Sequence, residues 1–142
     1  MENRAVLFVD DDEVVLKSIE SSIMDEPYDK YFVKSGEEAL EILRREEVHV
    51  IVVDIVMPGV GGLELLKIVK KEYPNIVSMV ISGHAQSADA MMLLQLEGVY
   101  RFVPKSWTFD EEVRTVIRQA IDHYNLQSEH EDIVAELGHC SE

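Results

Sequence analysis

The chain has 142 residues, of which 46% are hydrophobic, and its 28 acidic and 13 basic residues give a formal net charge of −15. This length favours one domain with a full core, and the acidic balance argues against direct binding to nucleic acid or to an anionic membrane, which needs clustered Lys and Arg. With Cys140 as the only cysteine and no apolar run approaching the about 20 residues of a membrane span, we expect a cytoplasmic protein in a reducing compartment.

The first part of the chain alternates apolar runs with amphipathic segments. Residues 5–9 are typical of a strand buried on both faces, and Asp12 is a candidate N-cap for the next helix. That helix is expected to use its apolar residues as a buried face, namely Val14, Val15, Leu16, Ile19, Ile23 and Met24. Residues 31–33 predict a short strand, and Ser35 with Glu38 predicts a capping box that begins a second helix.

The clearest strand prediction covers residues 50–54, where four β-branched residues lead into the carboxylate of Asp54. Pro58 and the glycines around it end this strand and predict a loop. We therefore expect Asp54 at the carboxyl end of a central strand, facing a crevice.

The second part of the chain continues the same alternation. Apolar runs predict two further strands, over residues 76–81 and 99–103. Helical periodicity predicts helices over residues 63–69 and 86–96 and a final helix that begins after a capping box at Thr108 and Glu111. Five strands alternating with helices favour an α/β fold with a doubly wound five-stranded parallel sheet. The strand order 2-1-3-4-5 would place the first and third strands together at the switch point, and the second strand, which brings no comparable polar group, at an edge.

The domain is expected to occupy residues 1–125, followed by an acidic extension over residues 126–142 that contains no Lys or Arg. Residues 109–137 contain no Gly or Pro, so at about 1.5 Å per residue they could form one helix of about 44 Å. Three interpretations of the extension stay open: a frayed acidic tail, a dimerising continuation of the helix, or the beginning of a linker to an output domain.

Reactive side chains follow four of the predicted strands. The first strand is followed by Asp10 and Asp11, the third ends in Asp54, the fourth is followed by Ser82, and the fifth leads to Lys105. Because the carboxyl ends of parallel strands line the ligand crevice of such a sheet, these groups are expected to converge. Three close carboxylates repel one another, and an all-oxygen set without Cys or His favours Mg²⁺, with Mn²⁺ as a substitute.

These groups fit the transfer of a phosphoryl group to a carboxylate. Beside Mg²⁺, Asp54 could attack phosphorus and form an aspartyl phosphate. The metal could bind one phosphoryl oxygen, Ser82 could hydrogen-bond a second, and Lys105 could pair with the third. Each residue alone has an ordinary explanation as a helix cap, a turn former or a solvated charge. Their occurrence together at strand ends favours the functional one.

In this combination the sequence resembles the receiver domain of bacterial two-component response regulators over residues 4–124, which implies a flavodoxin-like fold. The matching motifs are Val9-Asp10-Asp11-Asp12, residues 54–59 with Gly62, Ile81-Ser82-Gly83, and Phe102-Val103-Pro104-Lys105. The resemblance implies a phosphorylation-controlled signalling switch rather than an enzyme. Asp54 would accept the phosphoryl group from a histidine kinase or a phosphotransfer protein.

The resemblance also implies individual roles. Asp11 and Asp54 would bind Mg²⁺ directly together with the backbone carbonyl of Val56, and Asp10 would act on the ion through water. Ser82 and Phe102 would act as switch residues. The face made by the helix over 86–96, the last strand and the final helix would control an output domain or partner, or form a homodimer. Val56 and His84 would flank the path of the hydrolytic water, and we expect Val56 to cover the phosphoryl group and make it long-lived.

One position departs from the family pattern. Receivers usually follow the lysine with a proline joined by a cis bond, whereas Ser106 follows Lys105 here, and a cis bond to a residue other than proline costs about 2.5–4 kcal/mol. Two alternatives are kept: a phosphorylation-independent interaction module with the same fold, and a Mg²⁺-dependent hydrolase. The hydrolase lacks a second acid just after Asp54 to act as a general acid.

Overall fold

Five parallel strands form one sheet with the order β2-β1-β3-β4-β5. The structure is a computed structural model that describes residues 4–54, 62–82, 101–104 and 111–140. Its strands are β1 (Ala5–Val9), β2 (Asp29–Val33), β3 (Val50–Asp54), β4 (Val77–Ser82) and β5 (Arg101–Pro104). Its helices are α1 (Glu13–Ile23), α2 (Gly36–Arg45), α3 (Gly62–Glu72) and α5 (Glu111–Cys140). The predicted fold class and strand order are confirmed, and β2 lies at an edge as expected.

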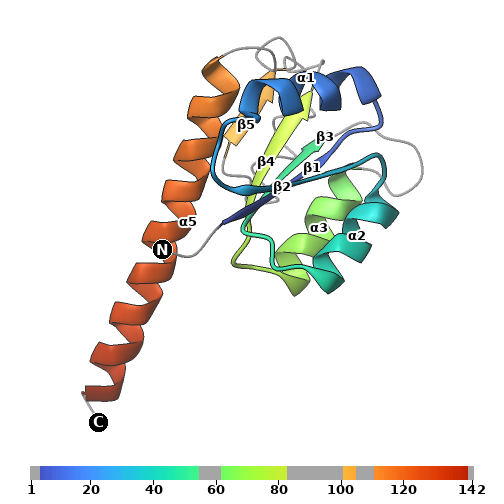
Figure 1. The fold of residues 1–142 in the computed structure, drawn as a ribbon. Helices are drawn as coiled ribbons and strands as arrows, with labels where there is room; N and C mark the ends of the chain where they lie inside the picture. The colour runs from blue at the N-terminus through green and yellow to red at the C-terminus, as the bar shows by residue number, and fades with distance from the viewer. Residues whose placement is uncertain (1–3, 55–61, 83–100, 105–110, 141–142) are drawn as a thin grey trace.

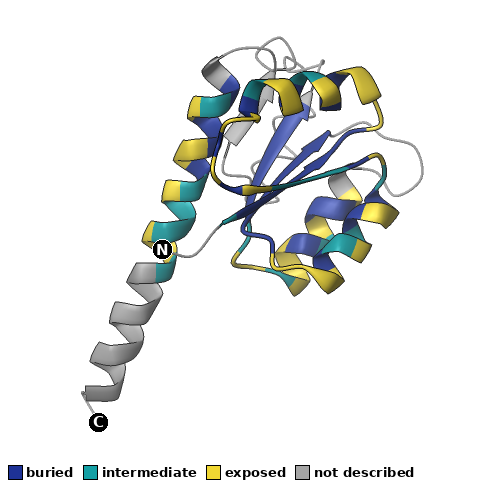
Figure 2. Ribbon diagram, in the orientation of Figure 1, coloured by how far each residue is buried: buried dark blue, intermediate teal, exposed yellow. Residues whose placement is uncertain are grey.

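Helices cover both faces of the sheet, with α1 and α5 on one side and α2 and α3 on the other (Figure 1). Successive side chains of a strand point to opposite faces, so β1 contributes to two separate cores. Val6 and Phe8 pack with α1 and α5, whereas Leu7 and Val9 pack with α2 and α3. This double burial explains why residues 5–9 are apolar without alternation, and Figure 2 shows the central strands buried throughout.

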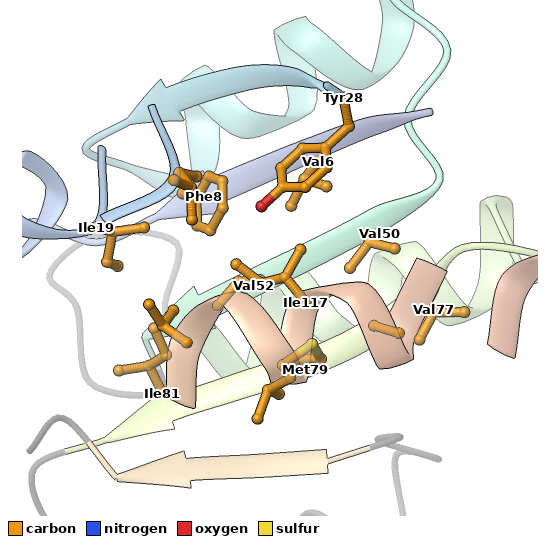
Figure 3. Packing of buried hydrophobic residues seen from close by; sticks show 14 of the residues in the cluster. Val6, Phe8, Ile19, Tyr28, Val50, Val52, Val77, Met79, Ile81 and Ile117 are labelled. Carbon is orange, nitrogen blue, oxygen red and sulfur yellow. The ribbon is translucent and has the colours of Figure 1, made fainter. Parts of the chain in front are cut away.

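The core beneath α5 joins this helix to three strands. Ile117 is 1% exposed and lies in one cluster with Val52 and Met79, as Figure 3 shows from close by. In the same cluster Phe8 stacks on the partly buried Phe32, with ring centroids 5.0 Å apart. The first turns of α5 are therefore held to the sheet by apolar packing.

The helix starts predicted at Asp12 and Ser35 are present in the structure. Asp12 caps α1, because its Oδ1 accepts a hydrogen bond from the Val14 N–H at 2.9 Å. Ser35 caps α2, and its Oγ accepts from the Glu38 N–H at 3.2 Å. The reciprocal bond of this capping box is displaced by one residue, since the Glu38 carboxylate accepts from the N–H of Lys34 rather than from that of Ser35.

Some sequence predictions need correction. Val14 and Met24, expected on the buried face of α1, are each 69% exposed, because that face follows Val15, Ile19 and Ile23 around the helix. Strand boundaries also shift, with β2 two residues longer at its start and β4 one residue later than predicted. The predicted helix over residues 86–96 and the cap at Thr108 lie outside the described residues.

Polar contacts attach α5 to the rest of the domain at two further places. Arg118 of α5 donates two hydrogen bonds to the Glu26 carboxylate, at 2.6 and 2.7 Å. Farther along α5, the Arg4 guanidinium lies 5.0 Å from the centre of the Tyr124 ring and donates to Asn125 at 2.8 Å. The helix then continues past the sheet, as one element of 30 residues (Figure 1).

The pairing of Glu26 with Arg118 predicts a pH-dependent contribution to stability. The hydrogen bonds from Arg118 hold the pKa of Glu26 below its ordinary value of 4.5, against the burial that raises it. A carboxyl with a lowered pKa stabilises the fold above its unfolded pKa, and this contribution disappears as the pH falls through the folded pKa. We expect Glu26→Gln to lower the urea midpoint at neutral pH, and the variant and wild type to converge as the pH falls through the lowered pKa of Glu26 in the folded protein.

The control for this prediction is Glu20→Gln, which changes an exposed carboxylate on α1. This variant should follow the wild-type dependence of the urea midpoint on pH. If Glu26→Gln lowered the urea midpoint by the same amount at neutral and acidic pH, the result would contradict a contribution from the ionised pair.

Candidate functional site

The register of the sheet brings two carboxylates to one level at its carboxyl edge. Val9 of β1 lies opposite Val53 of β3, so the next residues, Asp10 and Asp54, stand side by side where these neighbouring strands end. Both are almost completely buried, at 2% and 4% exposed, whereas Asp11 is exposed. The switch point between β1 and β3 is thus occupied by acids, as the strand order predicted.

The three acids form a cluster that could hold a metal ion. One carboxylate oxygen from each of Asp10, Asp11 and Asp54 lies within 4.8 Å of the other two. The Asp12 N–H donates to Oδ1 of Asp10 at 2.8 Å, which fixes the orientation of that carboxylate at the start of α1. Two unit charges at this separation repel by about 3.5 kcal/mol at an effective dielectric constant of about 20, so the cluster favours a cation among its oxygens.

The chemistry of these ligands fits Mg²⁺. They are carboxylate oxygens, which hard divalent cations prefer, and the cluster contains neither sulfur nor imidazole. Asp11 is exposed among the described residues, and hard cations of this kind complete their coordination with water or phosphoryl oxygens. The residues present therefore suit the metal that the sequence predicted.

A charged group that the sequence analysis left out lies beside this edge. Lys34 directly follows β2, and its Nζ lies 3.4 Å from the Glu13 carboxylate, at the first residue of α1. Lys34 and then Lys17 hold the pKa of Glu13 below its ordinary value. The second strand thus brings an ammonium after all, and the position of Lys34 immediately after Val33 was the signal for it.

The remaining predicted site residues are placed by backbone alone or lie outside the described residues. Ser82 ends β4 one residue beyond Ile81, which pairs with Asp54, and Phe102 lies in β5. Ser82 stands opposite Pro104, so β4 and β5 end at the same edge as the acid cluster. Three residues lie outside the described part of the chain: Val56, His84 and Lys105.

The family of the chain follows from this site together with a match to known proteins. Residues 6–122 match the family model described as the response regulator receiver domain, which covers the sheet and all three acids. The chain belongs to the response regulator receiver domain family. Receiver domains are regulatory domains of two-component systems, in which phosphorylation controls signalling, so the resemblance seen in the sequence is confirmed.

Two curated relatives of this receiver are named as transcriptional regulators. It is 35% identical over 136 residues to the hydrogenase transcriptional regulatory protein HoxA of Cupriavidus necator, covering 96% of this chain and 28% of that protein. It is 30% identical over 129 residues to the DNA-binding transcriptional regulator NtrC of Escherichia coli, covering 91% of this chain and 27% of that protein. The chain therefore spans little more than a quarter of the length of either relative.

A solved structure shows the same fold. The signal receiver domain of an HD domain-containing protein from Pseudomonas fluorescens superposes with a TM-score of 0.81 at 26% identity, covering 87% of this receiver and 98% of that chain. Among the helices that the structure describes, none is both long and apolar enough to cross a membrane.

Proposed function

We propose that this receiver is a phosphorylation-controlled switch in which Asp54 takes a phosphoryl group from a histidine kinase or a phosphotransfer protein. The observation that carries the proposal is the gathering of three carboxylates within 4.8 Å at the carboxyl edge of the sheet, in a chain that matches the receiver family over residues 6–122. The nucleophile would be a carboxylate oxygen of Asp54. Its bond to phosphorus forms as the phosphorus–nitrogen bond of the donor's phosphohistidine breaks, and the departing imidazole keeps the electron pair.

Different residues of this chain would bind the metal ion, attack phosphorus and bind the phosphoryl oxygens. Asp10, Asp11 and Asp54 would hold Mg²⁺, with the Val56 carbonyl as a further proposed ligand, and the bound ion would neutralise charge on the phosphoryl oxygens. Burial of Asp54 at the end of a rigid strand fixes its direction of attack. Ser82 and Lys105 are proposed to bind the other two phosphoryl oxygens, since Ser82 ends β4 at this edge and Lys105 directly follows the last residue of β5 in the sequence.

The output is proposed to pass through the predicted helix over 86–96, β5 and α5. Ser82 ends β4, which pairs with β5. A hydrogen bond from its hydroxyl to the phosphoryl group would therefore displace the end of β4 and, through the neighbouring strand β5, Phe102. HoxA and NtrC are named as transcriptional regulators, which supports an output that acts on transcription through another domain or partner. A homodimer through the same face remains part of the proposal.

The test of the function is phosphorylation by a small acyl-phosphate donor in the presence of Mg²⁺, followed by intact mass. The wild type should gain one phosphoryl group, and Asp54→Asn should gain none. Glu41→Gln, an exposed carboxylate on α2, is the control and should behave as the wild type. If the wild type stays unmodified at every donor concentration, the result would instead support the phosphorylation-independent interaction module. That alternative was suggested by Ser106, which stands where receivers usually have a proline.

The lifetime of the phosphorylated form gives a further prediction. Loss of the phosphoryl group needs a water in line with the bond between Asp54 and phosphorus. Val56, two residues after Asp54, cannot hydrogen-bond such a water, so the phosphorylated protein should be long-lived. Val56→Asn adds an amide that can hold water and should accelerate the decay measured after donor removal. If this variant decays no faster while His84→Ala decays more slowly, His84 rather than Val56 controls the water.

A further inference from the structure

A hollow of about 370 Å³ lies at the opposite edge of the sheet from Asp54. It is bordered by the segments that follow α2 and α3 and by the middle of α5, and Figure 1 shows the connections from α2 to β3 and from α3 to β4 at the same end of the sheet. A smaller hollow of about 80 Å³ continues from Tyr124 to Gln127 and Ser128 along α5. Together they form a groove whose described lining does not include Asp10, Asp11 or Asp54.

The lining of this groove, which we call the basal groove, is acidic and aromatic. Its principal residues are Glu46, Glu47, Glu72, Tyr73, Ile76 and Tyr124. Among the residues that the structure describes, neither Lys nor Arg lines either hollow, although basic residues occur in the last turns of α2 and α3. Both of these helices also direct their carboxyl ends here, and a helix carboxyl end carries about half a negative charge. The groove is therefore complementary to a cation with apolar surface.

One lining residue is held in place by neighbours inside the domain. His49, which is 4% exposed, accepts a hydrogen bond from the Ala5 N–H through Nδ1 at 2.9 Å. Its Nε2 must then carry the proton of the neutral ring, and it lies 3.2 Å from the Glu47 carboxylate. The same imidazole packs edge-on against Tyr124, with centroids 4.9 Å apart. Tyr124 is thus oriented before any ligand arrives, which lowers the cost of binding, and Glu47 stays exposed beside it.

The molecule already places a guanidinium against one of these residues. Arg4 lies over the Tyr124 ring at 5.0 Å and donates to Asn125 at 2.8 Å. Arginine suits such a site better than lysine, because its planar head stacks on aromatic rings and can bond a carboxylate with two parallel hydrogen bonds. The contacts of Arg4 demonstrate the first of these interactions at the border of the groove.

We propose that the basal groove binds an arginine side chain from a basic segment of a partner protein. The guanidinium would lie among Glu46, Glu47 and Glu72, with its apolar stem against Tyr73 and Ile76. A partner docked here would also contact α5 at Gln127 and Ser128. It would leave the acid cluster at the other edge accessible, so the proposal is independent of the phosphoryl-transfer function.

The experiment uses a peptide with both ends blocked, acetyl-Gly-Ser-Arg-Ser-Gly-amide. The peptide is titrated into the ¹⁵N-labelled full chain, and the amide shifts are followed by NMR. Amide shifts should change at residues 46–48, 72–76 and 124–128. The same peptide with citrulline, which keeps the shape but not the charge, should bind several-fold more weakly. Glu72→Gln, which changes an exposed side chain, should weaken binding of the arginine peptide about two- to fivefold.

The matched control is Glu41→Gln, which removes the same charge from an exposed position of α2 outside the groove. This variant should bind the peptide as the wild type does. The proposal is overturned if the arginine peptide does not bind, if the citrulline peptide binds equally well, or if Glu41→Gln and Glu72→Gln weaken binding alike. Shift changes centred on residues 10–12 would also overturn it, because they would show attraction to the acid cluster instead.

Discussion

Replacing Asp11 by alanine is expected to abolish both Mg²⁺ binding and phosphorylation while leaving the fold intact. Asp11 is the exposed member of the cluster, so its removal creates no cavity, yet it supplies one of the three carboxylate oxygens that lie within 4.8 Å of one another. Loss of a residue that merely orients a metal ligand costs about 10- to 100-fold in affinity, and loss of a ligand should cost at least as much. Calorimetric titration with Mg²⁺ and intact mass after acyl-phosphate treatment measure the two effects.

Asp25→Ala provides the control, because it removes an exposed carboxylate at the far end of α1 from the cluster. This variant should retain both Mg²⁺ binding and phosphorylation. Normal phosphorylation of Asp11→Ala at ordinary Mg²⁺ concentrations would show that the proposed metal site is wrong. Loss of both properties together with a collapsed near-ultraviolet dichroism spectrum would assign Asp11 to the fold instead.

Replacing Ile117 by alanine is expected to destabilise the domain by about 2–5 kcal/mol, the range for removing a large aliphatic side chain from a close-packed core. Ile117 is 1% exposed and joins α5 to the sheet core that includes Val52 and Met79. Alanine leaves a cavity there, since α5 is also fixed by Arg118 and Arg4 and cannot follow the missing side chain. Urea denaturation at neutral pH measures the change in free energy of unfolding.

Leu126→Ala tests whether this loss arises from packing rather than from helix formation. Leu126 lies on the same helix but is 64% exposed, and substitutions at such positions usually change stability by less than about 0.5 kcal/mol. A similar loss in both variants would mean that the packing of α5 contributes little to the domain.

The fold could be predicted from the sequence largely because its strands are buried on both faces. Such strands are continuous apolar runs, and those at residues 5–9 and 50–54 could be recognised without knowledge of their partners. The edge strand β2 was underestimated, because Asp29 and Lys30 are not apolar and owe their strand geometry to pairing with β1. Val14 and Met24 were wrongly included in the buried face of α1, because an apolar side chain alone does not show whether its position on the helix faces the sheet.

The acid cluster could be predicted for a related reason. Parallel pairing aligns the ends of neighbouring strands, so residues that follow β1 and β3 must meet once the strand order is known. The same rule places Lys34, which follows β2, at this edge, but its pairing with Glu13 could not be derived, because that pairing depends on the angle at which α1 leaves the sheet. The basal groove was also missed, as it arises where two loops and α5 approach one another rather than from any motif.

The helix α5 is long enough to extend well beyond the sheet (Figure 1). The helix touches the body of the domain as far as Gln127 and Ser128, beside Pro74 and Asn75, and then continues over residues 129–140. At about 1.5 Å per residue this last part of the helix is about 18 Å long, so a tilt of about 10° at residue 128 would displace its C-terminal end by about 3 Å. In the proposed switch, a rearrangement of side-chain size beside β5 that tilts α5 would thereby be magnified to the scale at which an output domain or a second subunit changes its contacts.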